Sequence, residues 1–493
     1  MKKTIIAYAL PLLFAVNLSE AAPVALFEKD YENIAKAVTN GSMMPEFEGQ
    51  IIEIEALEKS DNVAEFNTHY EVIFNDQEAL KLTEKGEVVF TNYAEDKGVA
   101  TIISTIDLLI DKNEEGVNKE LFRVDGIKGQ SQIDRENRQY KGAAQFPKMT
   151  LTNPDPDKKG IISIEGLTVD GTYGFNDDFT KIKTVNSVTK SGSIVVDIDD
   201  QKNHAKILAD SSSIVSQVDN AGKVQKMLFE IIAPKIFNAE SGMPFNELTF
   251  DKISYEAGAN VGDKGPTIYG DFALKNFILK LANSDHQGLL GDFSLDVQLT
   301  GLTEDLFEKL EDLSVSNMNP LEEGSIQEVF NLQEYAVPGS AIQVGLKGDL
   351  AGKGTENMVR IVPNTALIEV LTSLDLEDSE ALNQQFEGLT FFQFVNQYID
   401  EIDIDLAAKS DYIREMGAHI IFAQGEHTSI ESARAEMKEA YQQFMFVAAM
   451  INAETPIIEF VGNGIHVNIQ YKNNVWYVNG KETDLELIAS LFG

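Results

Sequence analysis

Apolar residues alternate with polar ones along many short stretches of the chain. In residues 292–299 every second side chain is apolar, which places the apolar set on one face of a pleated strand. The same alternation occurs in 161–169, 193–199, 249–255 and 342–347. It changes phase between Leu248 and Phe250 on one side and Ile253 and Tyr255 on the other, an offset that a β-bulge absorbs. The pattern predicts a strand-rich α+β fold, with extended antiparallel sheets and amphipathic helices packed on them.

Helical patterns are fewer and lie mostly in the second half. We expect helices over 26–39, 224–237, 304–313 and 381–402, the last with a break at Gly388. A further helix begins at the capping box formed by Thr428 and Glu431. Its apolar stripe consists of Ile430, Ala433, Met437, Tyr441, Phe444, Ala448 and Ile451. We interpret the stripe as a packing face, with a ligand groove as the alternative.

The carboxyl end carries the most specific pattern. Residues 465–471 alternate strictly, Asn473 and Asn474 follow, and a second apolar run begins at Val475. Two asparagines suit a two-residue hairpin turn because they tolerate left-handed backbone. The predicted cross-strand pairs are Lys472 with Val475, Tyr471 with Trp476, Gln470 with Tyr477 and Ile469 with Val478. A short helix capped by Thr483 is expected to follow.

Loop signals divide the chain only weakly. The strongest is 153–160, which contains two prolines, and a second break is expected around 258–266. We therefore expect a strand-rich region over 22–240 and an α+β region over 241–493 that ends in the hairpin and short helix. The alternative is that both form one elongated unit.

The amino end has the pattern of an export signal. Lys2 and Lys3 precede an apolar stretch over 5–18, and a small-x-small site ends at Ala21. We expect cleavage near Ala21, so that residues 1–21 are a signal peptide and the mature chain is periplasmic or extracellular. The alternative is an inner-membrane anchor, although a span needs about 20 apolar residues. No later segment is long and apolar enough to span a bilayer, so we expect none in the mature chain.

Charge and cysteine content exclude several classes of function. The chain has 79 Asp and Glu against 40 Lys and Arg, a net charge of −39, so nucleic acid is not an expected partner. It has no cysteine, which excludes disulfides, thiol catalysis and cysteine-ligated metals. The acids recur at the polar positions of predicted strands, as at Asp292 and Asp296. They therefore indicate solvated sheet faces, not a carboxylate active site.

No motif assigns a catalytic, cofactor-binding or metal-ligating residue. Six histidines are scattered without metal-ligand spacing: His69, His204, His286, His419, His427 and His466. Two acidic stretches, beginning at Asp111 and Asn153, have the alternating oxygen ligands of a calcium loop. Both lack the glutamate that closes such a loop at its twelfth position. No cofactor is therefore expected, and Ca²⁺ is kept as the alternative.

The ending over 465–481, with a strand, a tight turn and then Val475-Trp476-Tyr477-Val478-Asn479-Gly480-Lys481, resembles the close of the YdgA-like family of bacterial envelope proteins. Members of that family begin with an export signal or anchor and continue with amphipathic strands interrupted by helices. The resemblance implies location and architecture. It implies no chemistry, because the family offers no catalytic residues to carry over. This chain differs from the family in its expected cleavable signal, which argues against a membrane tether.

Two functional hypotheses follow. The first is a non-enzymatic structural or interaction module of the cell envelope, which binds an apolar ligand or another envelope protein. It predicts a long apolar surface at positions such as Phe293, Leu295, Val297 and Leu299. The second is a secreted or surface hydrolase, or an adhesin, without a recognisable motif. The hydrolase predicts a pocket where a histidine and a hydroxyl, or two acids, converge.

Overall fold

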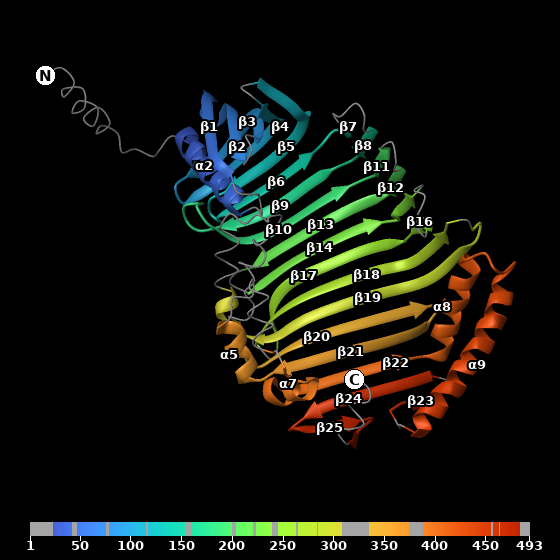
Figure 1. Ribbon diagram of the computed structural model, residues 1–493. Coiled ribbons are helices and arrows are strands. Elements are labelled where there is room, and N and C mark those ends of the chain that lie inside the picture. Colours follow the sequence, from blue (N-terminus) through green and yellow to red (C-terminus); the bar gives the residue numbers. More distant parts are fainter. Residues whose placement is uncertain are drawn as a thin grey trace. The chain divides into compact units, whose positions relative to one another are not determined.

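Long antiparallel strands make up most of the chain in the computed structural model, and a few helices pack against them (Figure 1). This confirms the strand-rich α+β fold that the alternating pattern predicts. The structure describes residues 23–41, 47–74, 78–114, 117–152, 159–199, 204–219, 223–238, 245–262, 265–282, 284–307, 335–373, 386, 388–454, 457–462 and 464–483. The chain divides into unit 1 (1–147, 167–188 and 312–326) and unit 2 (148–166, 189–311 and 327–493). The expected boundary at 240/241 falls outside the described residues and stays a prediction.

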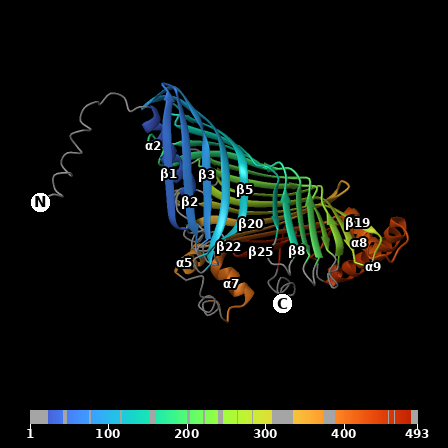
Figure 2. The ribbon, with the colours of Figure 1, turned by 90° about the horizontal axis from the view of Figure 1, so that it is seen from above.

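Unit 1 contains a meandering sheet and one helix. Its strands are β1 (Phe47–Ser60), β2 (Val63–Phe74), β3 (Glu78–Ala94), β4 (Lys97–Glu114), β5 (Val117–Asp134), β6 (Gln139–Gln145), β9 (Thr168–Phe175) and most of β10 (Ile182–Ser191). Consecutive strands from β1 to β6 pair antiparallel, and β9 pairs with β6. Figure 2 shows β1, β2 and β3 side by side with α2 next to them.

Helix α2 (Pro23–Gly41) supplies the core of unit 1 and confirms the helix expected over 26–39. Its apolar residues recur at helical spacing, so Phe27 and Ile34 project from one face and are buried. The Phe27 ring meets those of Phe66 and Phe90 edge-on, with centroids 5.7 and 5.9 Å away. Edge-to-face rings bury much area in a defined geometry, so this cluster fixes the helix on the sheet.

Buried polar side chains lie beside the same core. Asp30 of α2 is 2% exposed and accepts hydrogen bonds from Tyr93 at 2.5 Å and Arg135 at 2.7 Å. The next residue of α2, Tyr31, donates a hydrogen bond to Glu84, which is also buried. Burial raises the pKa of Asp30, and the bonds from Tyr93 and Arg135 oppose this only in part. Polar pairs therefore tie α2 to strand β3 and to the turn that follows β5.

Glu84 makes the stability of unit 1 depend on pH. Burial raises its pKa above 4.5, and hydrogen bonds from Ser104 and Tyr31 only reduce the shift. A raised pKa in the folded state gives stability that is complete below the unfolded value and is lost as pH rises through the folded value. The melting temperature of the wild type should therefore fall between pH 4.5 and neutrality. In Glu84→Gln, which has no carboxyl group at this position, we expect this fall to be smaller. Glu87→Gln, at an exposed position of β3, should follow the wild-type curve, and parallel curves for Glu84→Gln would refute the assignment.

Unit 2 contains a larger antiparallel sheet. Its strands are β7 (Met149–Thr152), β8 (Lys159–Ile164), β11 (Ile194–Asp199), β12 (His204–Ala209), β13 (Ser211–Asp219), β14 (Val224–Ile232), β15 (Lys235–Asn238), β16 (Phe245–Thr249), β17 (Lys252–Gly262), β18 (Gly265–Leu281), β19 (Gln287–Leu302), β20 (Ala336–Leu350), β21 (Lys353–Pro363), β22 (Ile399–Ala408), β23 (Glu459–Val461), β24 (Gly464–Lys472), β25 (Val475–Val478) and β26 (Lys481–Glu482). One line of pairing runs β13-β14-β17-β18-β19-β20-β21-β22-β24. A second runs β7-β8-β11-β12-β15-β16 and joins the other end of β18.

Several long strand patterns are interrupted by one or two residues. The stretch 249–255 breaks between β16 and β17 at Phe250 and Asp251, where the phase change predicts a bulge. On β18 the interruption is at Asn276, whose φ is +51° and whose amide donates to the Asp292 carboxylate at 2.8 Å. The stretch expected as one strand over 161–169 is likewise split, at Gly166 with a φ of +63°. Strands β17 and β18 also cover 258–262 and 265–266, so the break expected there is wrong for these residues, and 263–264 lie outside the described residues.

The helix predictions were partly wrong. Residues 224–237 form strands β14 and β15, because pairing with β13 and β17 overrides the helical spacing of their apolar residues. In 381–402 the described helix is α7 (Phe391–Tyr398), and Ile399 begins β22. Gly388, with a φ of +79°, marks the expected break. Of 304–313, residues 305–307 are helical and the remainder from 308 lies outside the described residues.

Two helices were not expected, α5 (Thr365–Ser373) and α8 (Ser410–Ala423), whereas α9 (Ile430–Glu454) was. On α9 the predicted stripe is buried at Ala433, Tyr441 and Ala448, but Phe444 is exposed. No helix in the described ranges is long and apolar enough to cross a membrane. The expected signal segment 1–21 and the helix expected after Thr483 lie outside those ranges.

The carboxyl-terminal hairpin was predicted correctly to the residue. Strands β24 and β25 pair Lys472 with Val475, Tyr471 with Trp476, Gln470 with Tyr477 and Ile469 with Val478. The turn residues Asn473 and Asn474 have φ values of +53° and +62°, as a left-handed two-residue turn requires.

Candidate functional site

One side of the unit 2 sheet carries rows of apolar side chains that cross many strands. The longest row takes one residue from each of β13, β14, β17, β18, β19, β20, β21 and β22: Ile214, Phe229, Tyr255, Phe272, Leu295, Leu346, Asn357 and Leu406. Directly paired residues project to the same side, so all of these lie together. The polar member, Asn357, accepts a hydrogen bond from the Ala407 amide at 2.8 Å. We call this side of the sheet the apolar face.

A parallel row lies two residues further along each strand. It contains Met227, Ala257, Gly270, Val297, Val344, Val359 and Ile404. The two rows together are two side chains wide along each strand and contain no charged residue.

Much of this face remains exposed. In the longest row Phe272, Leu295 and Leu346 are 38%, 40% and 51% exposed. Single exposed apolar residues are ordinary on a protein surface, but a contiguous set is not. Of the four positions expected to line an apolar surface, Leu295 and Val297 are exposed, whereas Phe293 and Leu299 are half-buried.

Among the described residues, helices cover the apolar face at the two ends of its strands and do not cover its exposed middle. At one end, α7 packs Val395 and Phe392 on a cluster that includes Ile402 and Trp476. At the other end, α8 places Tyr412 against Gly348 and the His419 carbonyl against Gly288, where a side chain on either glycine would collide. Figure 1 shows α5 and α7 at one end of β20, β21 and β22, and α8 and α9 at the other.

The opposite side of the same strands is polar. Glu256, Asp271 and Asp296 are paired across β17, β18 and β19. Lys226 forms an ion pair with Glu256 at 2.8 Å, and burial together with Asp296 and Glu256 raises the pKa of Asp271. The division that the sequence pattern predicts is thus present, with charge on one face and apolar side chains on the other.

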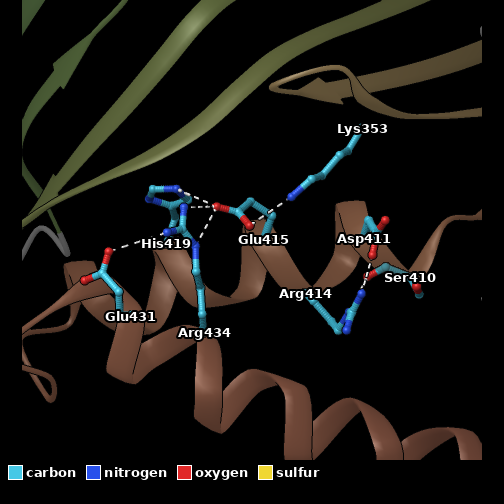
Figure 3. Close-up of polar contacts among 8 residues, drawn as sticks. All are labelled: Lys353, Ser410, Asp411, Arg414, Glu415, His419, Glu431 and Arg434. Carbon is cyan, nitrogen blue, oxygen red and sulfur yellow. Dashed lines mark hydrogen bonds and ion pairs between the residues drawn. The ribbon is translucent and has the colours of Figure 1, made fainter.

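A polar cluster fixes α8 and α9 to the sheet (Figure 3). Glu415 of α8 is 13% exposed and receives hydrogen bonds from Lys353 of β21 at 3.2 Å and from Arg434 Nε of α9 at 2.9 Å. Burial by itself raises the pKa of Glu415, but these bonds outweigh it and leave the pKa below its usual value. A carboxylate held ionised between two cations has little capacity to transfer protons, so the cluster acts as a structural clamp.

His419 belongs to the same clamp. Its Nδ1 accepts a hydrogen bond from the Leu289 amide at 3.2 Å, and its Nε2 lies 3.5 Å from Glu415. Burial lowers the pKa of His419, and Glu415 opposes this only in part. The ring is therefore neutral near pH 7, with both nitrogens engaged, and it connects α8 to β19.

The other predicted chemistry-bearing residues are dispersed. His427 contacts Ser432 and Glu436 at the start of α9, and His466 contacts Asp405 at 2.6 Å across β22 and β24. Asp111 lies within strand β4 and pairs with Lys81 at 2.8 Å, whereas Asn153 falls outside the described residues. Within the part of the chain that is described, no group of three histidines or acids is arranged to hold a metal ion. Calcium binding stays a prediction.

The sequence analysis identified strands of the apolar face but missed how far it extends. The extension depends on register between strands as distant as β14 and β22, and no local pattern encodes it. The clamp was missed altogether, because Lys353, Glu415 and Arg434 lie on separate elements. Comparisons of this chain with protein-family models, curated proteins and solved structures find no match.

Proposed function

We propose that this chain is an exported, non-enzymatic module of the cell envelope that holds the acyl chain of a lipid against its apolar face. The observation that carries the proposal is the longest row of that face, with exposed Phe272, Leu295 and Leu346 on three successive strands. Export rests on the amino-terminal pattern and the envelope on the YdgA-like resemblance.

An acyl chain suits this face for a physical reason. Burying apolar area is favourable by roughly 25 cal/mol per Å², and the rows offer that area without a charge that would need a partner. Neighbouring strands are about 4.8 Å apart, so a row of eight strands extends roughly 34 Å. Half of a bilayer's hydrocarbon core is roughly 15 Å thick, so one acyl chain would cross three or four strands.

The helices at the two ends support the same proposal. They cover the apolar face at the two ends of its strands while the side chains between those ends stay exposed, so the open part is bounded along the strands. The acidic opposite side disfavours the alternative that both faces are buried between sheets.

We expect the double variant Leu295→Asp/Leu346→Asp to lose bound lipid. The two residues are paired across β19 and β20, and a carboxylate inside an acyl contact costs several kcal/mol, so affinity should fall at least about tenfold. The measurements are native mass spectrometry with lipid extraction of the chain purified from cells, and titration with a fluorescent fatty acid.

The matched control is Gln298→Asp/Gln343→Asp, a cross-strand pair of the same two strands on the polar side. It introduces the same charge on the same two strands and should retain lipid. The proposal fails if wild-type protein carries no lipid and binds no fatty acid, or if both double variants lose binding equally.

A further inference from the structure

The last third of α9 exposes large apolar side chains. Phe444, Phe446, Val447 and Met450 are 48%, 66%, 52% and 58% exposed. Residues 444–453 contain no Asp, Glu, Lys or Arg. A helix of unit 2 with an ordinary solvated surface would carry polar side chains at these positions.

This part of α9 has no α8 beside it. The two helices contact each other where Arg414 lies over the Tyr441 ring at 5.9 Å and where Gly417 faces Met437. They run antiparallel, so α8 begins, at Ser410, near the level of Tyr441. The remaining turns of α9 extend beyond it toward β23 (Figure 1).

Strand β23, next to the end of α9, carries further exposed apolar side chains. The side chain of Asn452 donates to the Ile458 carbonyl at 2.8 Å and accepts from its amide at 2.7 Å, which holds the start of β23 at the last turn of α9. Phe460 and Val461 follow directly and are 41% and 61% exposed. We call Phe444, Phe446, Val447, Met450, Phe460 and Val461 the apolar tip.

We propose that the apolar tip docks on the surface of a lipid bilayer whose headgroups are electrically neutral. A helix end with exposed aromatic and aliphatic side chains inserts its apolar face at the boundary between headgroups and acyl chains. The tip shares no residue with the face proposed to hold an acyl chain, so this inference does not rest on that function.

The charged residues near the apolar tip indicate which kind of lipid surface it binds. Interfacial helices that bind anionic lipid carry Lys and Arg, and 444–453 has none. Exposed Lys438 and Glu439 precede the tip and exposed Glu459 lies beside Phe460, so the local charge is negative by one, and the whole chain has a net charge of −39. Anionic lipid and a second copy of this chain are both repelled, whereas a neutral lipid surface is not.

The test is flotation of the full chain with vesicles of pure phosphatidylcholine. We expect wild-type protein to float with them and Phe446→Gln/Val447→Gln/Met450→Gln to lose at least tenfold in partitioning. Adding phosphatidylglycerol to the vesicles should weaken wild-type binding. The matched control is Ala435→Gln/Glu439→Gln, at exposed positions in the first part of α9, and it should float like wild type.

A spectroscopic readout reports contact directly. In the background Trp476→Phe, which removes the sole tryptophan, Phe446→Trp should shift its emission to the blue when phosphatidylcholine vesicles are added. The emission of Glu439→Trp in the same background should not shift.

Absence of flotation by wild type overturns the proposal. So does a wild-type dimer that the triple Gln variant dissociates in sedimentation, since the tip would then be an interface between copies. Fatty-acid titration of the same variants separates this result from the function of the apolar face.

Discussion

Replacing Arg135 with Met is expected to lower the free energy of unfolding by about 3–5 kcal/mol. Arg135 and Asp30 form an ion pair at 2.7 Å with side chains 8% and 2% exposed. Removing the guanidinium leaves the Asp30 carboxyl buried without its cation, so that it must take up a proton or be desolvated as an anion. Circular dichroism in urea measures the loss, and hydrogen exchange of residues 23–41 shows whether α2 detaches first.

Two variants isolate the cause. Arg123→Met removes ion pairs with Glu120 and Asp125, in which the side chains are about half exposed, and its cost should be much smaller than that of Arg135→Met. Adding Asp30→Asn to Arg135→Met removes the unpaired charge and should recover part of the stability. If the double variant is no more stable than Arg135→Met alone, lost packing is responsible and not the buried carboxylate.

Truncating Trp476 to Ala is expected to cost about 3–5 kcal/mol. The Trp476 ring is 3% exposed, lies 4.9 Å from the Tyr471 ring and meets the Phe392 ring of α7 at 6.0 Å. The cavity left by the truncation would destabilise both the terminal hairpin and α7, the helix that covers the apolar face at one end of its strands. Thermal unfolding followed by circular dichroism measures the cost, since the variant has no tryptophan.

Trp476→Phe is the matched comparison. It keeps an aromatic ring against Tyr471 and removes the indole Nε1, which is buried without a hydrogen-bond partner among the described residues. We expect its cost to stay under about 1.5 kcal/mol. Equal losses for the Ala and Phe variants would show that a phenyl ring does not replace the packing of the indole, which would contradict this expectation.

The terminal hairpin shows where local sequence suffices. The pair Asn473 and Asn474 defines the turn, and once the turn is set the register of β24 against β25 follows without information from elsewhere. The strand alternation in 292–299 is equally local, since it states which side chains share a face but not what that face meets.

The wrong helix over 224–237 shows where local sequence fails. Its apolar residues fit a helical stripe, yet Val224, Ile231 and Ile232 are β-branched and favour a strand when partners exist on both sides. Those partners, β13 and β17, belong to other stretches of the chain. Tertiary pairing with these strands therefore decided that the segment is not a helix.

The sequence by itself determined the strand-rich class, the polar and apolar sides of individual strands and the hairpin, because each depends on neighbours within a few residues. It also placed Leu295 and Val297 on an apolar surface. Only the tertiary structure decided that the rows join across eight strands, that helices cover their ends and that Lys353, Glu415 and Arg434 clamp one of those helices. The physical reason is that register and helix docking are set by contacts between residues far apart in the chain, which the spacing within any one segment does not encode.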